Sequence, residues 1–409
     1  MDDLRWPTYA IRKTMLDGAV FDDVPPGKGS MRVRDHEGNV YLDAVGGIGC
    51  LPLGHAHPKW IAAIEAQMRK LVAAAGTFWT EPQQQLASEL ARRIPLAQPR
   101  TFIGNTGTEV TEAAIKLSLR ATKRDVILVL DRAFHGRTLG AIAMTANIAY
   151  RQPYVTCLGE EGSSFAHMNI ARAPYGDLDA VKSLFDRYAG RVAMLAVEPI
   201  QGEAGIYPAS RDFLVGLREL CTKHGALLGD DEIQAGSGRT GRFLAWTTLV
   251  GDDPSLQPDI VWLAKAIGGG FPVAACVTTD ALAQHMVKGS HGSTFGGNPL
   301  AAAAAVATLR IMDEEGLMNA AAAQLPTLQR IAAEDPEPRV VEVRGSGAMI
   351  GIQISGESQP AAPLGDAMQK LGVLVTICSG HTVRVLLPYA AGEAELRQVW
   401  QTLKRALAA

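Results

Sequence analysis

A lysine followed by glycines is the strongest single candidate for chemistry in this sequence. In PDIVWLAKAIGGGFP, residues 258–272, Lys265 ends an apolar run and precedes three glycines. A lysine amine in apolar surroundings loses its proton more easily, and the free amine is a nucleophile for carbonyl groups. A lysine whose stem lies on apolar surface while its charge stays in water is the more common alternative. Alone, the segment leaves both interpretations open.

Carboxylates follow two other apolar runs. In LLGDDEIQAGSGRTG, residues 227–241, three acids stand directly after a run that resembles a buried strand. Buried carboxylates are costly unless they are paired or solvated, so a partner is implied. VEPIQGEAG, residues 197–205, places Glu198 and Glu203 after another such run. Ligands of open α/β sheets bind at the carboxyl ends of the strands, so we expect these acids near a binding site.

Two segments suit a phosphate. GNTGTEVTEAAIKLSLR, residues 104–120, leads small and hydroxyl residues into an amphipathic helix, whose free N–H groups attract anions. An ordinary helix cap is the plainer interpretation, and the spacing matches neither a Walker A loop nor the dinucleotide fingerprint. HGSTFGGNP, residues 291–299, is a similar segment, and AFHGRTLGA, residues 133–141, offers an aromatic ring, an imidazole and a guanidinium.

The elements that must position these residues alternate along the chain. Apolar runs begin near residues 126, 192, 226, 260 and 273, and helical stretches separate them. Runs without strict polar alternation are typical of strands covered on both faces, so the pattern predicts a mostly parallel sheet between helices. After residue 300 a long alanine-rich helix leads to further strands, which we expect to form an α+β unit. VRGSGAMIGIQI is expected as one strand and SGESQPAAPLG as a loop.

Composition excludes several functional classes. The chain has 409 residues, with 39 Lys and Arg against 42 Asp and Glu, so the net charge is 39 − 42 = −3. This balance argues against a nucleic-acid partner, and no apolar run is long enough for a membrane span. Five widely spaced cysteines and the absence of a secretory pattern predict a reduced, cytoplasmic protein. His55 and His57 lack a third ligand at a suitable spacing, so no metal is expected.

Taken in order along the chain, these motifs resemble the class III (subgroup II) pyridoxal-phosphate aminotransferases. The resemblance extends from GGIG and LGHAHP to the final helix. It implies the PLP-dependent transferase fold type I: a large domain with a mostly parallel seven-stranded sheet flanked by helices, and a smaller α+β domain from both termini. We expect residues 1–50 to join the small domain, residues 51–300 to bind pyridoxal phosphate, and residues 301–409 to complete the small domain.

The resemblance assigns the cofactor ring to five residues. Lys265 would form the Schiff base with pyridoxal phosphate and later move the proton of the substrate carbon. Asp231 would pair with the pyridine nitrogen and keep it protonated. Gln234 would bond the ring oxygen, and the ring would lie between Phe134 and Ile233.

The resemblance also implies a phosphate site shared between subunits. Thr106, Gly107 and Thr108 match the phosphate cradle, and His135 belongs to the same set of cofactor-binding residues. Thr294 resembles the threonine that reaches the phosphate of the partner subunit. A homodimer with shared active sites, with pairing into tetramers left open, is therefore expected.

Four residues are implied for the small-molecule substrates. Arg384, in TVRVLLP, matches the arginine that binds the α-carboxylate of glutamate or 2-oxoglutarate, for which a guanidinium fork is suited. Glu203 resembles the glutamate that masks this arginine while an ω-amine donor reacts. Arg137 resembles a second carboxylate clamp. Ile48 stands where ornithine aminotransferases carry a tyrosine that meets the substrate carboxylate.

The donor is the least determined part of the prediction. TFWTEPQQQLASEL, FHGRTLGA and HGSTFGGNP resemble acetylornithine aminotransferases, whereas RVLLPYA is closer to 4-aminobutyrate enzymes. We expect transfer of the terminal amino group of N-acetylornithine to 2-oxoglutarate in two half-reactions. 4-Aminobutyrate, ornithine or a lysine derivative is the alternative donor. An aminomutase and a protein that keeps the fold without catalysis are the remaining alternatives.

Overall fold

The main sheet confirms the predicted α/β class. The computed structural model describes residues 14–154, 164–165, 168–355 and 361–408. Its largest sheet has the order β4-β13-β12-β11-β8-β5-β7-β6. Six of its seven main strands run parallel, β13 runs antiparallel, and β6 is a two-residue antiparallel edge. The strands are β4 Pro99–Gly104, β5 Val126–Leu130, β6 Ser164–Phe165, β7 Met168–Ala173, β8 Val192–Val197, β11 Leu227–Asp231, β12 Ile260–Leu263 and β13 Ala274–Thr279.

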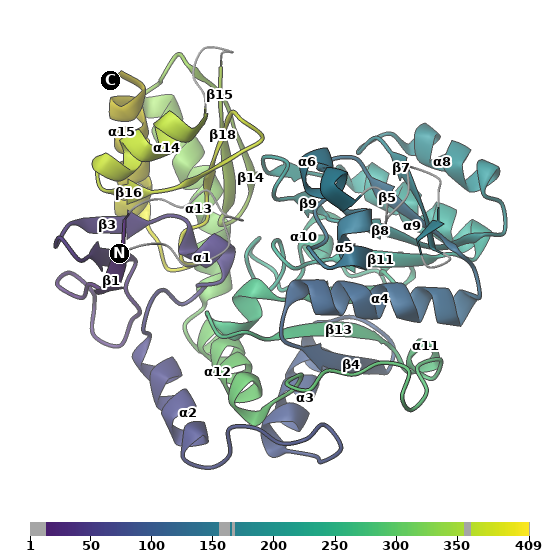
Figure 1. The fold of residues 1–409 in the computed structure, drawn as a ribbon. Coiled ribbons are helices and arrows are strands. Elements are labelled where there is room, and N and C mark those ends of the chain that lie inside the picture. Colours follow the sequence, from purple (N-terminus) through teal and green to yellow (C-terminus); the bar gives the residue numbers. More distant parts are fainter. Residues whose placement is uncertain (1–13, 155–163, 166–167, 356–360, 409) are drawn as a thin grey trace.

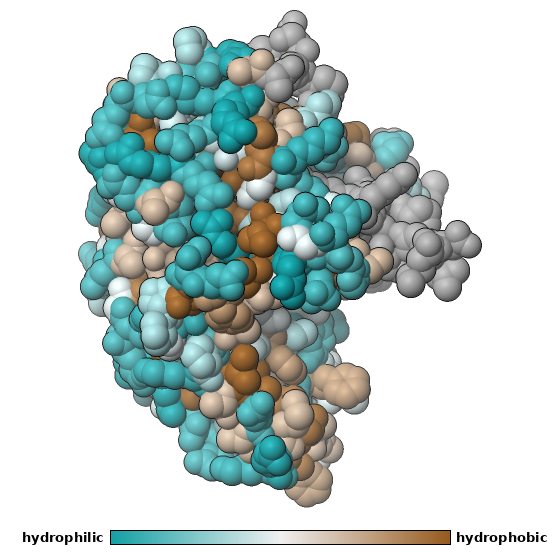
Figure 2. Space-filling model, turned by 90° about the vertical axis from the view of Figure 1, so that its left-hand side faces the viewer, coloured by the Kyte–Doolittle hydropathy of each residue, from teal (hydrophilic) through white to brown (hydrophobic). Residues whose placement is uncertain are grey.

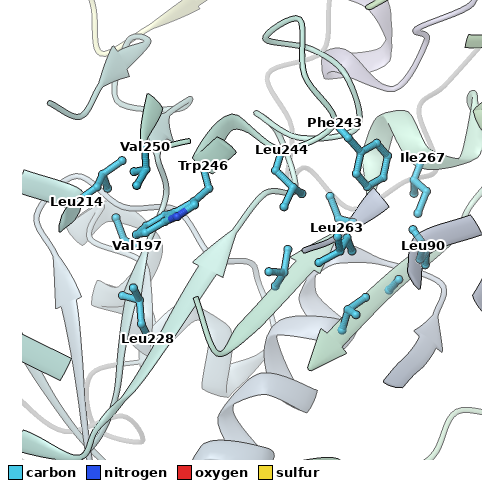
Figure 3. Close-up of a cluster of buried hydrophobic side chains, with 14 of the residues drawn as sticks. Leu90, Val197, Leu214, Leu228, Phe243, Leu244, Trp246, Val250, Leu263 and Ile267 are labelled. Atoms are coloured by element: carbon cyan, nitrogen blue, oxygen red, sulfur yellow. The ribbon is translucent and has the colours of Figure 1, made fainter. Parts of the chain in front are cut away.

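Helices cover both faces of this sheet (Figure 1). Along β5, Ile127 and Val129 pack in the cluster with α4, whereas Leu128 packs in the cluster on the other face. This alternation is what a strand buried on both sides requires. Figure 3 shows part of the second cluster, where Trp246 lies among strand and helix side chains. The helices and short elements around the sheet are α3 Glu81–Arg93, α4 Gly107–Thr122, α5 Leu139–Met144, α6 Ile148–Arg151, α8 Leu178–Arg187, β9 Ile200–Gln201, β10 Tyr207–Pro208, α9 Arg211–His224, α10 Ala245–Leu249, α11 Asp280–Ala283 and α12 Pro299–Glu314.

Two four-stranded sheets lie beside the large one. The first has the order β1-β2-β3-β16 and joins the two ends of the chain, because β16 pairs parallel to β3. The second has the order β14-β15-β18-β17 and is wholly antiparallel. Their elements are β1 Leu16–Ala19, β2 Arg32–Asp35, β3 Val40–Asp43, α13 Leu317–Glu334, β14 Val340–Ser346, β15 Met349–Ile354, α14 Ala361–Lys370, β16 Val373–Leu374, β17 Thr376–Cys378, β18 Thr382–Val385 and α15 Glu393–Ala408.

Three local expectations for the chain outside the main sheet need correction. VRGSGAMIGIQI is a hairpin of β14 and β15, because Gly347 at φ +55° turns the chain within the expected single strand. The expected loop SGESQPAAPLG contains the start of α14 at Ala361, and residues 356–360 lie outside the described residues. Apolar residues recur at helical spacing from Ile61 to Val72 and predict one helix there, but α2, Pro58–Met68, ends four residues before Val72.

The packing of α12 bears on how the chain divides. Ala301, Ala305 and Leu309 of α12 belong to the hydrophobic cluster of the large sheet. Leu328 and Ile331 of α13 belong instead to the cluster beneath the small sheets. The boundaries at residues 50 and 300 stay predictions. We propose that the carboxyl-terminal unit begins after α12, because that helix buries its apolar side against the large unit.

Apolar side chains remain exposed on α2 and beyond it. None of the α2 side chains is fully buried, and Met68 is 53% exposed. Figure 2 shows hydrophobic side chains gathered among hydrophilic ones, partly at the level that α2 occupies in Figure 1. Within the described ranges, no helix is both long and apolar enough to cross a bilayer.

A half-buried carboxylate, Glu89, connects α3 to α12, and its loss should be measurable. Glu89 accepts hydrogen bonds from Arg93, from Arg92 Nη2 at 2.7 Å and from Arg310 Nε at 3.3 Å. Burial raises the pKa of Glu89, but the arginines outweigh it and hold that pKa at about 2. Because the folded pKa is depressed, this stabilisation is complete above the unfolded value of about 4.5 and disappears as pH falls towards 2.

Glu89→Gln is therefore expected to lower the free energy of unfolding by about 1–3 kcal/mol at pH 7. The difference from the wild type should shrink between pH 4.5 and pH 3 in calorimetric melts. Glu81→Gln, an exposed change on the same helix, is the control. A difference that stays constant over this pH range would show that the charge of Glu89 is not responsible.

Candidate active site

A cavity of about 380 Å³ opens at the carboxyl ends of β11 and β12. This is the edge where ligands of open α/β sheets bind. Eight of the predicted cofactor residues line it: Thr106, Gly107, Thr108, Phe134, His135, Asp231, Ile233 and Gln234, together with Lys265. Segments far apart in the sequence therefore meet at one place, as the motifs predicted.

Lys265 stands directly after β12 in a strained backbone conformation. Its φ is +45°, in the left-handed region that residues other than glycine seldom adopt. Such strain is concentrated at functional sites, where the surrounding structure holds it in place. Desolvation by the surrounding protein lowers the pKa of Lys265 the most, and the charge of Arg384 lowers it further, against the opposing effect of Glu203. The amine is therefore closer to its nucleophilic, uncharged form than an exposed lysine.

Asp231 is the last residue of β11, and its carboxylate contacts the buried imidazole of His135. Asp231 Oδ2 lies 2.7 Å from His135 Nδ1, and Oδ1 accepts the Ile233 amide at 3.1 Å. Both side chains are almost fully buried. Burial lowers the pKa of His135, but the hydrogen bond and charge of Asp231 outweigh this and hold it above the usual value. The pair therefore fixes the orientation of the Asp231 carboxylate at the cavity wall.

The start of α4 offers backbone amides to the cavity. Thr106 is the N-cap, and Glu109 completes a capping box by accepting the amides of Asn105 at 2.8 Å and Thr106 at 2.9 Å. The amides of Gly107 and Thr108 occupy the first helical turn, where helices leave N–H groups unpaired. A Cβ on Gly107 would lie 2.8 Å from Ile233 Cδ1, so this glycine keeps the cavity open. Both interpretations of the sequence, helix cap and phosphate cradle, are thus compatible with one geometry.

The opposite wall is held by a buried glutamate. Phe134 lines the cavity, and its amide donates to Glu198 Oε2 at 2.9 Å. Burial raises the pKa of Glu198 to about 7, so its carboxyl takes up a proton near neutral pH. The motif EPIQGE pointed to Glu198 only as an acid at a strand end. Its bond to the Phe134 backbone was beyond sequence reasoning.

A half-buried glutamate, Glu203, forms an ion pair with the buried Arg384 beside the cavity. Arg384 Nη1 lies 2.5 Å from Glu203 Oε1, and the Arg384 side chain is 3% exposed. Gln234 joins them: its Oε1 accepts from Arg384 at 3.1 Å and its Nε2 donates to Glu203 at 3.4 Å. Burial raises the pKa of Glu203, but Arg384 outweighs it and holds that pKa below the usual value. The carboxylate is therefore charged and covers the guanidinium.

Three predicted site residues, Arg137, Thr294 and Ile48, are exposed to solvent in this chain. Arg137 is exposed at the cavity rim, with its guanidinium 3.4 Å from the Tyr150 ring centroid. Thr294 is exposed and is not part of the cavity lining in this single chain, and Ile48 is 43% exposed and outside the lining. Ile48 has a φ of +62°, so its backbone adopts the left-handed conformation within the GGIG turn. The cavity wall near this turn is Cys50, two residues on.

Several lining residues were missing from the predicted set. They are Cys50, Asn105, Gly136, Glu198, Ala264, Gly270, Phe271, Pro272 and Val273. The GGGFP segment after Lys265 was a visible signal for three of them, Gly270, Phe271 and Pro272. Cys50 carried no signal, because its contribution depends on how the amino-terminal turn folds back onto the large sheet.

The fold and the cavity together define an α/β enzyme with a nucleophilic lysine, a buried carboxylate and an anion cradle. The chain belongs to the class III aminotransferase family: the family model described as aminotransferase class-III matches residues 21–407. It is therefore a transaminase that depends on pyridoxal phosphate, as the motifs implied.

Named relatives share most of the chain. It is 40% identical over 384 residues to the acetylornithine aminotransferase of Methanopyrus kandleri, covering 94% of each chain. It is 38% identical to that of Corynebacterium efficiens, covering 93% of this chain and 91% of the relative. Among solved structures, the Toxoplasma gondii ornithine aminotransferase has a TM-score of 0.86 at 26% identity and covers 98% of this chain and 91% of its own. The Elizabethkingia anophelis acetylornithine aminotransferase has a TM-score of 0.78 at 27% identity, with 98% and 96% covered.

Proposed function

We propose that this chain transfers the terminal amino group of N-acetylornithine or a similar ω-amino acid to 2-oxoglutarate. The observation that carries the proposal is the ion pair of Glu203 with Arg384 at the cavity. A covered guanidinium leaves an apolar approach for the distal end of a donor, and an uncovered one binds a dicarboxylate. Relatives at 38–40% identity named acetylornithine aminotransferase support this donor.

The lining residues fit pyridoxal phosphate in kind and position. The cavity combines a lysine amine, a buried carboxylate, helix-start amides and an aromatic wall, and a Cβ at position 107 would press on the Ile233 side chain. When bound, pyridoxal phosphate supplies an aldehyde that exchanges amines and a ring that accepts electrons. We assign Lys265 to the aldehyde and Asp231 to the ring nitrogen. Phe134 and Ile233 take the two ring faces, and the Gln234 amide the ring oxygen.

We assign binding of the cofactor phosphate to the first turn of α4. Thr106, Gly107 and Thr108 supply backbone amides and two hydroxyls there, where the helix dipole favours negative charge. The Thr108 hydroxyl also accepts the amide of Thr138 at 3.1 Å, which fixes its direction. His135 supports Asp231, because its Nδ1 lies 2.7 Å from Asp231 Oδ2 and holds that carboxylate in place.

Proton movement is assigned to Lys265 and substrate orientation to the arginines. With its pKa lowered by burial, Lys265 Nζ can take the proton from the amine-bearing carbon and return it to the neighbouring carbon of the conjugated system. Arg384 binds the α-carboxylate of glutamate or 2-oxoglutarate in the second half-reaction. Arg137, exposed at the rim, is the second clamp for the carboxylate of either substrate.

The proposal includes a homodimer. Trp79 is 83% exposed, Phe78 67% and Phe295 65%, and Phe295 adjoins the exposed Thr294. Large aromatic side chains in water mark an interaction surface. A second copy covering them would bring Thr294 of one subunit to the phosphate site of the other. Light scattering after gel filtration should give twice the 43.5 kDa chain mass; a monomer would contradict a shared site.

The function is tested by absorbance of the purified holoenzyme. N-Acetylornithine, ornithine, 4-aminobutyrate and glutamate are added separately, and 2-oxoglutarate follows. The visible band should bleach with an ω-amine donor and with glutamate, and return with 2-oxoglutarate. Bleaching by 4-aminobutyrate but not acetylornithine would replace the donor. Turnover without any keto acid would favour an aminomutase, and a protein that never binds the cofactor would overturn the proposal.

Glu203→Gln should hinder the reaction of the ω-amine. Without the ion pair, Arg384 is free to hold the α-carboxylate of the donor, which turns its terminal amine away from the cofactor; a donor with a free α-amine, such as ornithine, would then present that amine instead. We expect the half-reaction of the ω-amine donor to slow by about ten- to a hundredfold relative to that of glutamate, the equivalent of about 1.4–2.7 kcal/mol. Stopped-flow absorbance measures both rates.

The matched control for this change is Glu337→Gln. Glu337 pairs with Arg339 Nε at 2.8 Å and does not line the cavity. It should leave the ratio of the two half-reactions as in the wild type. An unchanged ratio in Glu203→Gln would show that this carboxylate does not select the donor end.

A further inference from the structure

Arg239 is a buried cation that holds three distant backbone segments. Its side chain is fully buried in the loop that follows β11. Nη1 donates to the carbonyls of Leu387 at 2.9 Å and Ala348 at 3.3 Å, and Nη2 donates to the carbonyl of Gly49 at 3.0 Å. Its guanidinium lies 4.7 Å from the ring centroid of Tyr389. No carboxylate of the described residues forms an ion pair with it.

Two of the three segments held by Arg239, those of Gly49 and Leu387, lead to residues of the active site. Gly49 precedes Cys50, which lines the cavity. Leu387 follows Arg384 by three residues and lies two residues after the end of β18. The loop that carries Arg239 follows Asp231, the last residue of β11, and it includes Gln234. One guanidinium therefore connects the cofactor side of the site, the substrate-carboxylate side and the amino-terminal turn.

Backbone bonds around Arg239 reinforce the same junction. The Ala348 amide donates to the Arg239 carbonyl at 2.8 Å, and the Leu386 amide donates to the Ala44 carbonyl at 2.8 Å. The Tyr389 hydroxyl donates to the Ser237 carbonyl at 2.8 Å. These bonds hold the segments together, but only the guanidinium contacts all three of them at once.

An uncompensated charge is a costly way to fill a core. Moving a guanidinium out of water without a carboxylate partner is unfavourable, and apolar side chains of similar volume often replace buried charges without loss of stability. An apolar side chain cannot donate hydrogen bonds to three carbonyls, whereas the rigid, planar guanidinium does so at once. Lysine has the charge but presents it from one flexible point. The residue type thus points to geometry rather than to stability.

We propose that Arg239 is a positioning residue that sets the place of the Arg384 clamp and the Cys50 wall relative to Asp231, and thereby the affinity for the substrate carboxylate. The inference rests on the proposed function for the role of Arg384. Displacing a binding group by about 1 Å can cost as much as a hundredfold in a reaction that depends on alignment.

The test compares Arg239→Lys and Arg239→Met with a matched arginine. Arg124 Nη1 likewise donates to two backbone carbonyls, those of Val192 and His224, both at 2.9 Å, but near the opposite ends of the strands. Arg124→Lys is therefore the control. For each holoenzyme we measure the calorimetric dissociation constant for glutarate, a dicarboxylate that cannot react, the KM for 2-oxoglutarate, the absorbance band of the bound cofactor, and the melting temperature.

Both Arg239 variants should keep the cofactor band and weaken glutarate binding and raise the KM by about tenfold or more, with kcat changed less. Arg124→Lys should shift only the melting temperature. Wild-type glutarate affinity in folded Arg239→Lys and Arg239→Met would overturn the inference and leave the proposed function intact. A wild type that binds glutarate but transfers no amino group would overturn the proposed function, and the glutarate affinities would still decide the role of Arg239.

Discussion

Lys265→Ala is expected to fold and to lose nearly all turnover, with kcat lower by about ten-thousandfold or more. The amine does two things in the proposed reaction: it binds the cofactor aldehyde, and it carries the proton between two carbons. General acid–base catalysis alone contributes about 10²–10⁴. Cofactor absorbance, single-turnover rates with acetylornithine and a thermal melt give the three readouts.

Two comparisons make the Lys265 result specific. Lys116→Ala removes an exposed lysine of α4 outside the cavity lining and should keep the wild-type rate. Lys265→Gly removes the left-handed strain at φ +45° together with the amine, so it should melt at or above the temperature of Lys265→Ala. Substantial turnover in either Lys265 variant would remove this lysine from the mechanism.

Strands buried on both faces were predictable from the sequence because their pattern is local. VILVL and VAMLAV are near-continuous apolar runs, and they form β5 and β8 at the centre of the sheet. PRTFIG forms β4 at the sheet edge and mixes charged with apolar residues, so no run marked it. The antiparallel direction of β13 was equally hidden, because direction depends on which strand the chain returns to and not on residue type.

The site was predictable only as far as its motifs are contiguous. Asp231, Ile233 and Gln234 lie in one segment, and Lys265 follows the neighbouring strand, so their meeting follows from a parallel sheet. Glu203 and Arg384 are 181 residues apart, and only the resemblance to a family suggested their pairing. The acceptors of Arg239 are backbone carbonyls, which every residue possesses, so no sequence pattern could identify them.

Asp231→Asn is expected to leave the protein folded and to lower kcat by about a hundred- to a thousandfold, the range for removing one preorganised electrostatic contact. The amide keeps the shape of the side chain but not its negative charge. Without that charge the ring nitrogen is less readily protonated, and electrons leaving the substrate carbon are less well accommodated. Proton abstraction should slow in single-turnover absorbance, while cofactor binding changes less.

The neighbouring acid provides the control, because strand alternation points Asp230 to the other face of β11. Asp230 is fully buried and outside the cavity lining, and desolvation together with the charges of Glu232 and Asp231 raises its pKa well above the usual value. The raised pKa favours the uncharged form of Asp230, so Asp230→Asn changes the charge at β11 less than Asp231→Asn does. The rate should stay within about twofold of the wild type, a difference of less than about 0.5 kcal/mol. An acid with a raised folded pKa destabilises the protein as pH rises above the unfolded pKa of that acid. Asp230→Asn should therefore melt at the same temperature as the wild type or at a higher one at pH 8.

Equal slowing by both substitutions would mean that β11 responds to any change in its packing. A wild-type rate in Asp231→Asn would place the partner of the ring nitrogen elsewhere.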